Sequence, residues 1–214
     1  MYDSQFFIRN KGENPGVNVD LSARCGLECP RCQRQTYFSS NKDIPGHDLT
    51  VDDFVKITDY FKSINFCGQL SDPVHNEYFI DILRLCKMKN VDGVIHNVSS
   101  LKSKEWYIEA FQAHPDMRWV FGIDGLPKDS HKYRTNQDGE KLFQVLKTAR
   151  KHLTRKPIWQ YIIFAYNEDT IDEAHQMAID IDVDFMIVNS SRWHGPNDPF
   201  KPKNPNYSLN LHNV

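Results

Sequence analysis

The stretch VNVDLSARCGLECPRC, residues 17–32, decides how the rest of the chain is interpreted. It opens with an apolar, β-branched run at 17–21 and continues into a loop that holds Cys25, Cys29 and Cys32. Thiolates are soft ligands, suited to iron–sulfur clusters and to zinc. Such a loop can place three thiolates on three corners of a cubane and leave one iron without a protein ligand, as a catalytic zinc site keeps one position open. We therefore predict a [4Fe-4S] cluster on these three cysteines.

The competing assignment is a structural zinc site, completed by a fourth ligand such as His47. Structural zinc ions ordinarily take four ligands, and their cysteines come in C-x2-C pairs. Cys29 and Cys32 form the one such pair in the sequence. The spacing favours the cluster and keeps zinc as the alternative.

The composition fits one globular domain in a reducing compartment. The chain has 214 residues, 40% hydrophobic and 25% charged, with a formal net charge of −2. This charge gives no general attraction to nucleic acid or to an anionic membrane. No apolar run reaches the ~18 residues of a membrane span, and the first residues lack a secretion signal pattern. Five cysteines with one tight group argue against a secreted disulfide framework. We expect a cytoplasmic protein without nucleic-acid or membrane partners.

Short β-rich runs alternate with helical patterns along the chain. The runs are flanked mostly by Gly, Pro, Asn or Asp, as buried parallel strands are. Thr50 and Ser103 are candidate helix caps, and Thr170 with Glu173 predicts a capping box. The predicted strands are 17–21, 64–67, 93–97, 119–123, 158–164 and 184–188, and the predicted helices are 50–62, 78–89, 103–113, 139–153 and 170–181.

Six strands and five helices in strict alternation predict a parallel sheet with right-handed crossovers. The expected fold class is α/β, a partial (β/α)6 TIM-like barrel of parallel strands. A flavodoxin-like open sheet obeys the same pattern, so both topologies stay open. We assign residues 1–191 to the core domain and residues 192–214, with four prolines and five asparagines, to a C-terminal tail. This tail is either packed across the barrel, as a candidate lid, or disordered.

These features resemble the radical S-adenosylmethionine (radical SAM) enzymes, whose signature is C-x3-C-x2-C after the first strand of a partial (β/α)6 barrel. The resemblance covers residues 17–192 and is closest to the core domain of sulfatase-maturing and peptide-modifying (SPASM-type) members. No cysteine follows Cys86, so the auxiliary-cluster domain of that branch is not expected in this chain. The resemblance implies a [4Fe-4S] cluster and S-adenosyl-L-methionine (SAM) as cofactors.

The resemblance also implies SAM contacts after the second and third strands. Gly68, Gln69 and Asp72 stand where the family has a glycine-rich segment that binds the SAM amino group, with Asp72 as the acid in place of the usual Gly-Gly-Glu. Asn97 and Ser99 stand in the turn that follows the third strand in relatives. The alternative for all five is ordinary turn and capping chemistry.

Further matches follow the fourth and fifth strands. Asp124 resembles the Asp of a Ser-Ile-Asp-Gly motif, with Gly122 in place of the Ser. Arg134, ten residues later, matches an Arg that holds the SAM carboxylate, a task that suits a guanidinium fork. Asn167 closes the segment that lines the adenine and ribose side. The alternatives are an Asp-Gly turn, a solvated surface Arg and a capping Asn. Arg31 stands where many relatives have an aromatic residue against adenine.

The implied reaction is reductive cleavage of SAM to methionine and a 5′-deoxyadenosyl radical, which abstracts hydrogen from a substrate. No catalytic residue beyond the cluster ligands is expected. The implied partners are a one-electron donor of the flavodoxin or ferredoxin type and an unknown peptide or small-molecule substrate. The alternative function is a non-catalytic, zinc- or cluster-stabilised module for binding or redox sensing.

Overall fold

The computed structural model describes residues 16–67, 70–190 and 193–207. Within these ranges one parallel sheet of six strands has the order β1-β2-β3-β4-β5-β6. A flavodoxin-like sheet reverses its order at the centre, so that alternative is wrong. The two outer strands do not pair with each other in the described residues, so the partial barrel is open and the predicted fold class is confirmed. The strands are β1 Gly16–Val19, β2 Ser63–Phe66, β3 Asp92–Asn97, β4 Arg118–Gly122, β5 Ile158–Ile162 and β6 Asp184–Val188.

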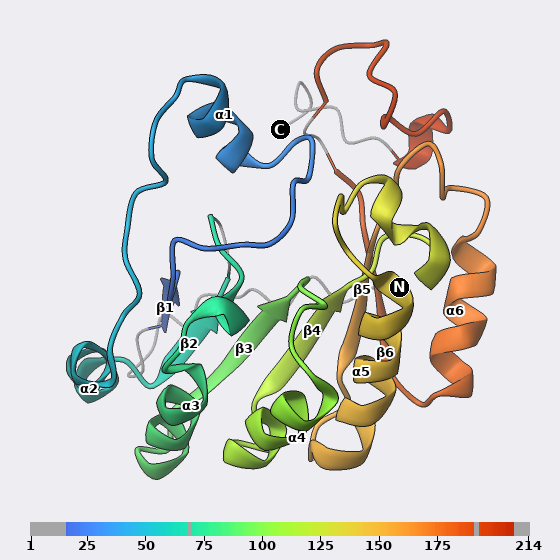
Figure 1. Ribbon diagram of the computed structural model, residues 1–214. Helices are drawn as coiled ribbons and strands as arrows, with labels where there is room; N and C mark the ends of the chain where they lie inside the picture. The colour runs from blue at the N-terminus through green and yellow to red at the C-terminus, as the bar shows by residue number, and fades with distance from the viewer. Residues whose placement is uncertain (1–15, 68–69, 191–192, 208–214) are drawn as a thin grey trace.

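Helices α2 to α6 lie along the outer side of the curved sheet, while α1 lies beyond the carboxyl ends of the strands (Figure 1). Since each crossover helix returns to the same side, the opposite side of the sheet stays concave. None of the helices in the described ranges has the length and apolar character needed to cross a bilayer. The helices are α1 Gln33–Ser39, α2 Val51–Tyr60, α3 Phe79–Met88, α4 Lys104–Ala113, α5 Gly139–His152 and α6 Ile171–Asp180, with short 3-10 helices η2 Pro73–His75, η3 Pro127–Lys132 and η4 Pro205–Tyr207.

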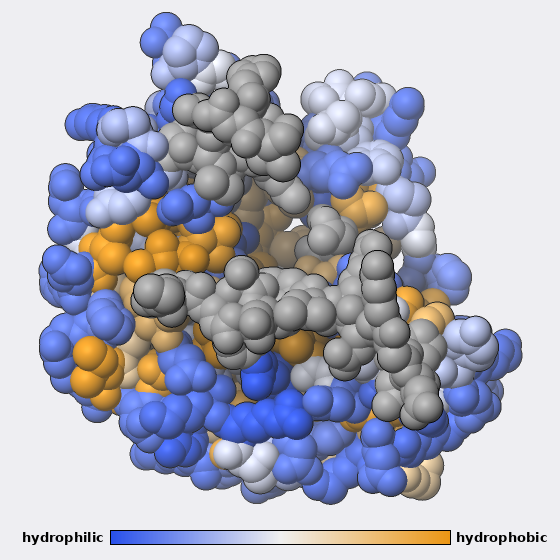
Figure 2. Space-filling model, turned by 180° about the vertical axis from the view of Figure 1, so that it is seen from behind, coloured by the Kyte–Doolittle hydropathy of each residue, from blue (hydrophilic) through white to orange (hydrophobic). Residues whose placement is uncertain are grey.

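The hydrophobic core lies between the sheet and these helices. Trp119 and Phe121 of β4 are fully buried there, with their rings stacked 5.8 Å apart. The alternate strand positions, such as His96 and Gln160, point to the concave side because successive strand residues face opposite ways. Seen from that side, the molecule is hollowed, with hydrophobic residues beside and inside the hollow (Figure 2).

Two helix predictions need correction. The sequence pattern predicts no helix after Cys32, but α1 begins at the next residue; its run has no apolar stripe, and Arg34 is its one buried residue. The predicted capping box at Thr170 is wrong. The Thr170 hydroxyl donates to the carbonyl oxygen of Asn167 and lies 3.0 Å from the Tyr161 hydroxyl, so it makes no cap bond to α6.

Candidate functional site

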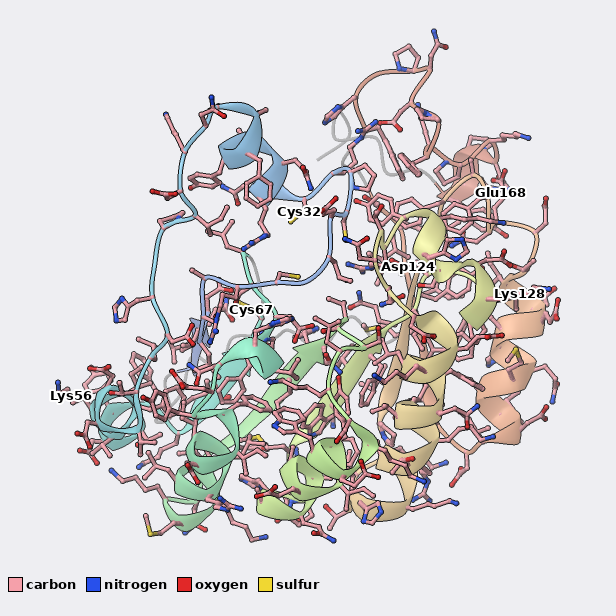
Figure 3. The ribbon with its side chains drawn as sticks, viewed as in Figure 1. Cys32, Lys56, Cys67, Asp124, Lys128 and Glu168 are labelled. Atoms are coloured by element: carbon pink, nitrogen blue, oxygen red, sulfur yellow. The ribbon has the colours of Figure 1, made fainter. Side chains whose placement is uncertain are left out.

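The cysteine loop runs from β1 to α1 across the carboxyl ends of the strands (Figures 1 and 3). Its backbone is tightly turned: the Cys32 N–H donates to the Cys29 carbonyl oxygen at 3.0 Å, and the Leu27 N–H donates to the Cys25 sulfur at 3.5 Å. Cys29 is buried, and the other two cysteines are partly buried. The three cysteines share a second hydrophobic cluster with Leu27, Tyr133, Phe164, Val98, Ile162, Tyr166, Trp193 and Phe200. The loop therefore places the predicted ligands in one hydrophobic cluster, at the end of the sheet where α/β active sites lie.

The donor set fits an iron–sulfur cluster. All three thiols are free, and three soft donors from one loop suit the corners of a cubane. Among the described residues no group of three or more Cys, His, Asp or Glu side chains is already arranged to hold a metal ion, and His47 is exposed. Burial raises the pKa of Cys25 to about 12 and also raises that of Cys29. Since thiolates are the ligands, iron must displace these protons when it binds.

Asp72 joins three loops around this site. Its carboxylate accepts the backbone N–H groups of Val98 at 2.7 Å, Ser99 at 2.8 Å and Val74 at 3.1 Å. Its own N–H donates to the carbonyl oxygen of Arg24 in the cysteine loop at 3.1 Å. Burial raises the pKa of the Asp72 carboxyl to about 6, against the effect of the N–H bonds. The contact of Asp72 with the SAM ammonium stays a prediction, because the structure shows its carboxylate bound to backbone.

The turn after β3 is held by its own side chains. Asn97 donates to the Tyr107 hydroxyl at 3.0 Å and accepts the Ser99 N–H at 3.1 Å, and Tyr107 donates to the Ser99 carbonyl oxygen at 2.7 Å. All three residues are buried. Asn167 closes its own turn in the same way, accepting the Phe164 N–H at 2.7 Å. These contacts are the capping chemistry of the alternative interpretation, and the predicted SAM contacts of the two asparagines and Ser99 are not tested by them.

Asp124 and Arg134 form a buried ion pair. Arg134 Nε lies 2.7 Å from Asp124 Oδ2, with the two side chains 13% and 0% exposed. Asp124 Oδ1 accepts the Ile162 N–H at 2.8 Å, so Asp124 also joins the ends of β4 and β5. Arg134 lies next to Cys29 and lowers the pKa of its thiol, opposing the larger effect of burial. The alternative of a solvated surface arginine is therefore wrong.

Gln137 is a site residue that no sequence pattern indicated. Its side-chain amide donates to the carbonyl oxygens of Val98 at 2.6 Å and Gly122 at 2.9 Å, and its own oxygen accepts the Ser130 hydroxyl. It thus ties the ends of β3 and β4 together. Gln137 lies in a polar stretch of sequence that is typical of a surface loop. Only its low exposure of 5% in the structure distinguishes it from an ordinary loop residue. Gly68 and Gln69 lie outside the described residues.

The fold of this chain is similar to that of several solved structures, although its sequence matches no family model. No protein-family model and no curated protein sequence matches the chain. Several solved structures match the chain. Streptococcus suis SuiB bound to S-adenosylmethionine matches with a TM-score of 0.68 and 17% identity, and the match covers 88% of this chain and 43% of SuiB. The enzyme anSMEcpe with bound AdoMet matches with a TM-score of 0.61 and 15% identity, over 91% and 56%. Methylornithine synthase (PylB) matches with a TM-score of 0.58 and 15% identity, over 80% and 52%.

These neighbours are radical SAM enzymes. The chain has the fold of this class, an open six-stranded parallel barrel with the cysteine loop after its first strand. It spans roughly half of the length of the three relatives named above. At these identities the likeness establishes the fold, and the activity is proposed below.

Proposed function

We propose that this chain is a radical SAM enzyme that binds a [4Fe-4S] cluster through Cys25, Cys29 and Cys32. The observation that carries the proposal is the presence of three free thiols in one loop, across the carboxyl end of a radical SAM fold. The bound, reduced cluster would supply one electron to SAM, breaking the sulfur–C5′ bond to give methionine and a 5′-deoxyadenosyl radical that abstracts hydrogen from a substrate. The chain's own residues would bind, orient and shield the reactants.

The contacts of these residues indicate the role of each one in the proposed site. Asp72, Asn97 and Gln137 hold the loops after β2, β3 and β4 in place, so the cofactor site is organised before SAM enters. Asp124 orients the Arg134 guanidinium next to Cys29. From there the N–H groups of Arg134 that do not bond to Asp124 or Cys29 would receive the SAM carboxylate. The aromatic cluster beneath the cysteines keeps water from the reacting centre.

The substrate class and the electron donor extend this proposal. A precursor peptide, SuiA, is bound in one structure of the neighbour SuiB, which supports a peptide as the substrate here, with a small molecule as the alternative. The expected electron donor is a flavodoxin or ferredoxin in the cytoplasm. Cys25, Cys29, Cys32 and Cys86 are free thiols, which agrees with a reducing compartment.

Metal and product analysis test the function directly. We expect the protein purified or reconstituted without air to hold about four irons with sulfide, and to form 5′-deoxyadenosine from SAM under dithionite. Cys25→Ala, Cys29→Ala and Cys32→Ala combined should abolish both, measured by iron analysis and mass spectrometry.

Cys86→Ala is the matched control. Cys86 lies in α3 and is fully buried in the core between helices and sheet, away from the cysteine loop. This variant should keep wild-type iron and product. One zinc and no iron in the wild type would instead support the zinc-stabilised module, and iron without deoxyadenosine would support the redox sensor.

A further inference from the structure

The C-terminal segment 193–207 packs against the cysteine loop. The rings of Trp193 and Phe200 lie 6.1 Å and 6.2 Å from the ring of Phe164, and Phe200 lies 5.2 Å from Tyr133. The three cysteines belong to the same cluster of contacts. Figure 1 shows the segment at the same end of the sheet as the cysteine loop. Residues from the far end of the sequence thus lie in the same cluster as the three cysteines.

An ion pair links the segment to the cysteine motif itself. Arg31, between the second and third cysteines, lies with its Nε 2.9 Å from Asp198 Oδ2, and the two side chains are 16% and 0% exposed. The Arg31 guanidinium also stands 5.6 Å from the ring centre of Phe200. The Coulomb attraction within a pair so shielded from water is screened less than that within an exposed pair.

Asp198 also shapes the segment on which the aromatic residues stand. Its carboxylate accepts the backbone N–H of His194 at 2.7 Å and that of Phe200 at 3.0 Å. The Phe200 carbonyl oxygen accepts the Ala165 N–H at 3.0 Å, which ties the segment to the loop after β5. Asp198 therefore stabilises the backbone of the segment and also attaches the segment to Arg31.

Trp193 has a polar group whose hydrogen bond is not satisfied. Its indole N–H is buried and has no hydrogen-bond partner in the described structure. A buried donor without a partner is costly and is usually matched by a bound group. Because it sits in the aromatic cluster around the cysteines, a flat ligand with an acceptor atom would suit this position.

We propose that residues 193–207 form a wall of the SAM site, held against the cysteine loop by the Arg31–Asp198 pair. The inference rests on the proposed function and extends it to the nucleoside of SAM. A purine presents a flat face to Phe200 and ring nitrogens that accept a hydrogen bond from Trp193. Arg31 and Asp198 are positioning residues in this arrangement, and Trp193 and Phe200 make the contact.

The first measurement uses the iron-free protein, so it does not depend on the cluster. In Arg31→Met and Asp198→Asn the segment should open more often, and chymotrypsin should cleave within it about tenfold faster. Arg31→Lys keeps the charge and should restore most of the protection. Arg84→Met removes the exposed pair with Glu109, at 53% and 54% exposure, and should leave the cleavage rate unchanged.

The second measurement uses the iron-loaded protein and SAM itself in equilibrium dialysis. Arg31→Met and Asp198→Asn should raise the Kd for SAM about tenfold with the iron content unchanged, and Trp193→Phe should raise it about fivefold. Wild-type affinity in these variants overturns the inference, even where cleavage is faster, since the segment then merely packs on the loop. A wild-type protein that holds no iron or binds no SAM overturns the proposed function instead.

Discussion

At the scale of single residues, Gly122 explains how Arg134 reaches its place. A Cβ atom on Gly122 would lie 2.7 Å from Val98 Cγ1 and 3.3 Å from an Arg134 terminal nitrogen. The first distance is shorter than real Cβ contacts, and valine has little freedom to turn aside. The absence of a side chain at this position lets Arg134 lie across the end of β4 and pair with Asp124. The Gly that replaces the Ser of related motifs is thus a packing requirement in this chain.

Gly122→Ser should therefore destabilise the fold. Forcing a side chain into a filled space costs about 1–3 kcal/mol, and we expect a loss of this size in the free energy of unfolding in urea. Gly16→Ser is the control, because a Cβ there would meet nothing closer than 3.6 Å. Equal stability of the two variants would contradict the packing argument, whereas partial recovery in Gly122→Ser with Val98→Ala would support it.

At the scale of elements, α2 begins with the clearest local signal in the chain. The Thr50 hydroxyl accepts the Asp53 N–H at 3.2 Å, and the Asp53 carboxylate accepts the Thr50 N–H at 3.2 Å. Each satisfies a backbone donor that the first turn of a helix leaves open. The cap predicted at Thr50 is confirmed, and so is the cap at Ser103, whose hydroxyl accepts the Trp106 N–H.

Thr50→Ala should cost about 1 kcal/mol of the free energy of unfolding, because the first turn of α2 loses the acceptor of its Asp53 N–H. Thr148→Ala is the matched control: Thr148 lies inside α5, and its hydroxyl donates to the Gln144 carbonyl oxygen without capping the helix. That change should be neutral or slightly stabilising. Urea unfolding followed by circular dichroism compares the two, and a Thr50→Ala variant as stable as the wild type would refute the cap's contribution.

At the scale of the whole molecule, burial shifts the pKa values of two ionisable groups in opposite directions. It lowers the pKa of His96 to about 4 and raises that of Asp72 to about 6. The unfolded chain protonates His96 near its ordinary value of 6.5, so the His96 contribution to stability is complete above about pH 6.5 and is lost as pH falls towards 4. The Asp72 contribution has the opposite sign: it is present at low pH and is lost as pH rises through about 6.

His96→Gln should therefore resist acid better than the wild type. We expect the two proteins to diverge between about pH 6.5 and about pH 4, by at most about 3 kcal/mol in the free energy of unfolding. Comparison at each pH cancels the contribution of Asp72, which both proteins share. Parallel stability curves over this range would show that His96 titrates normally in the folded protein.

Much of the fold was predictable because its signals are local. The six strands lie within two residues of their predicted bounds, since short apolar runs between turn residues are buried strands in a parallel sheet. α1 was not predictable, because its sequence has no apolar stripe and it buries one residue. Thr170 shows the converse case. The capping pattern is present in the sequence, but the Thr170 hydroxyl forms hydrogen bonds with Tyr161 and Asn167 instead of capping α6.

The sequence by itself determined the βα alternation and the three-cysteine loop, because both are patterns among neighbouring residues. The tertiary structure alone decided the strand order, since both candidate topologies share one pattern. It also decided the partners of the buried polar groups, which lie far apart in the chain. Gln137 meets Val98 across 39 positions and Arg31 meets Asp198 across 167. Such contacts follow from the need of each buried charge or amide for a partner, and only the folded chain shows which one it finds.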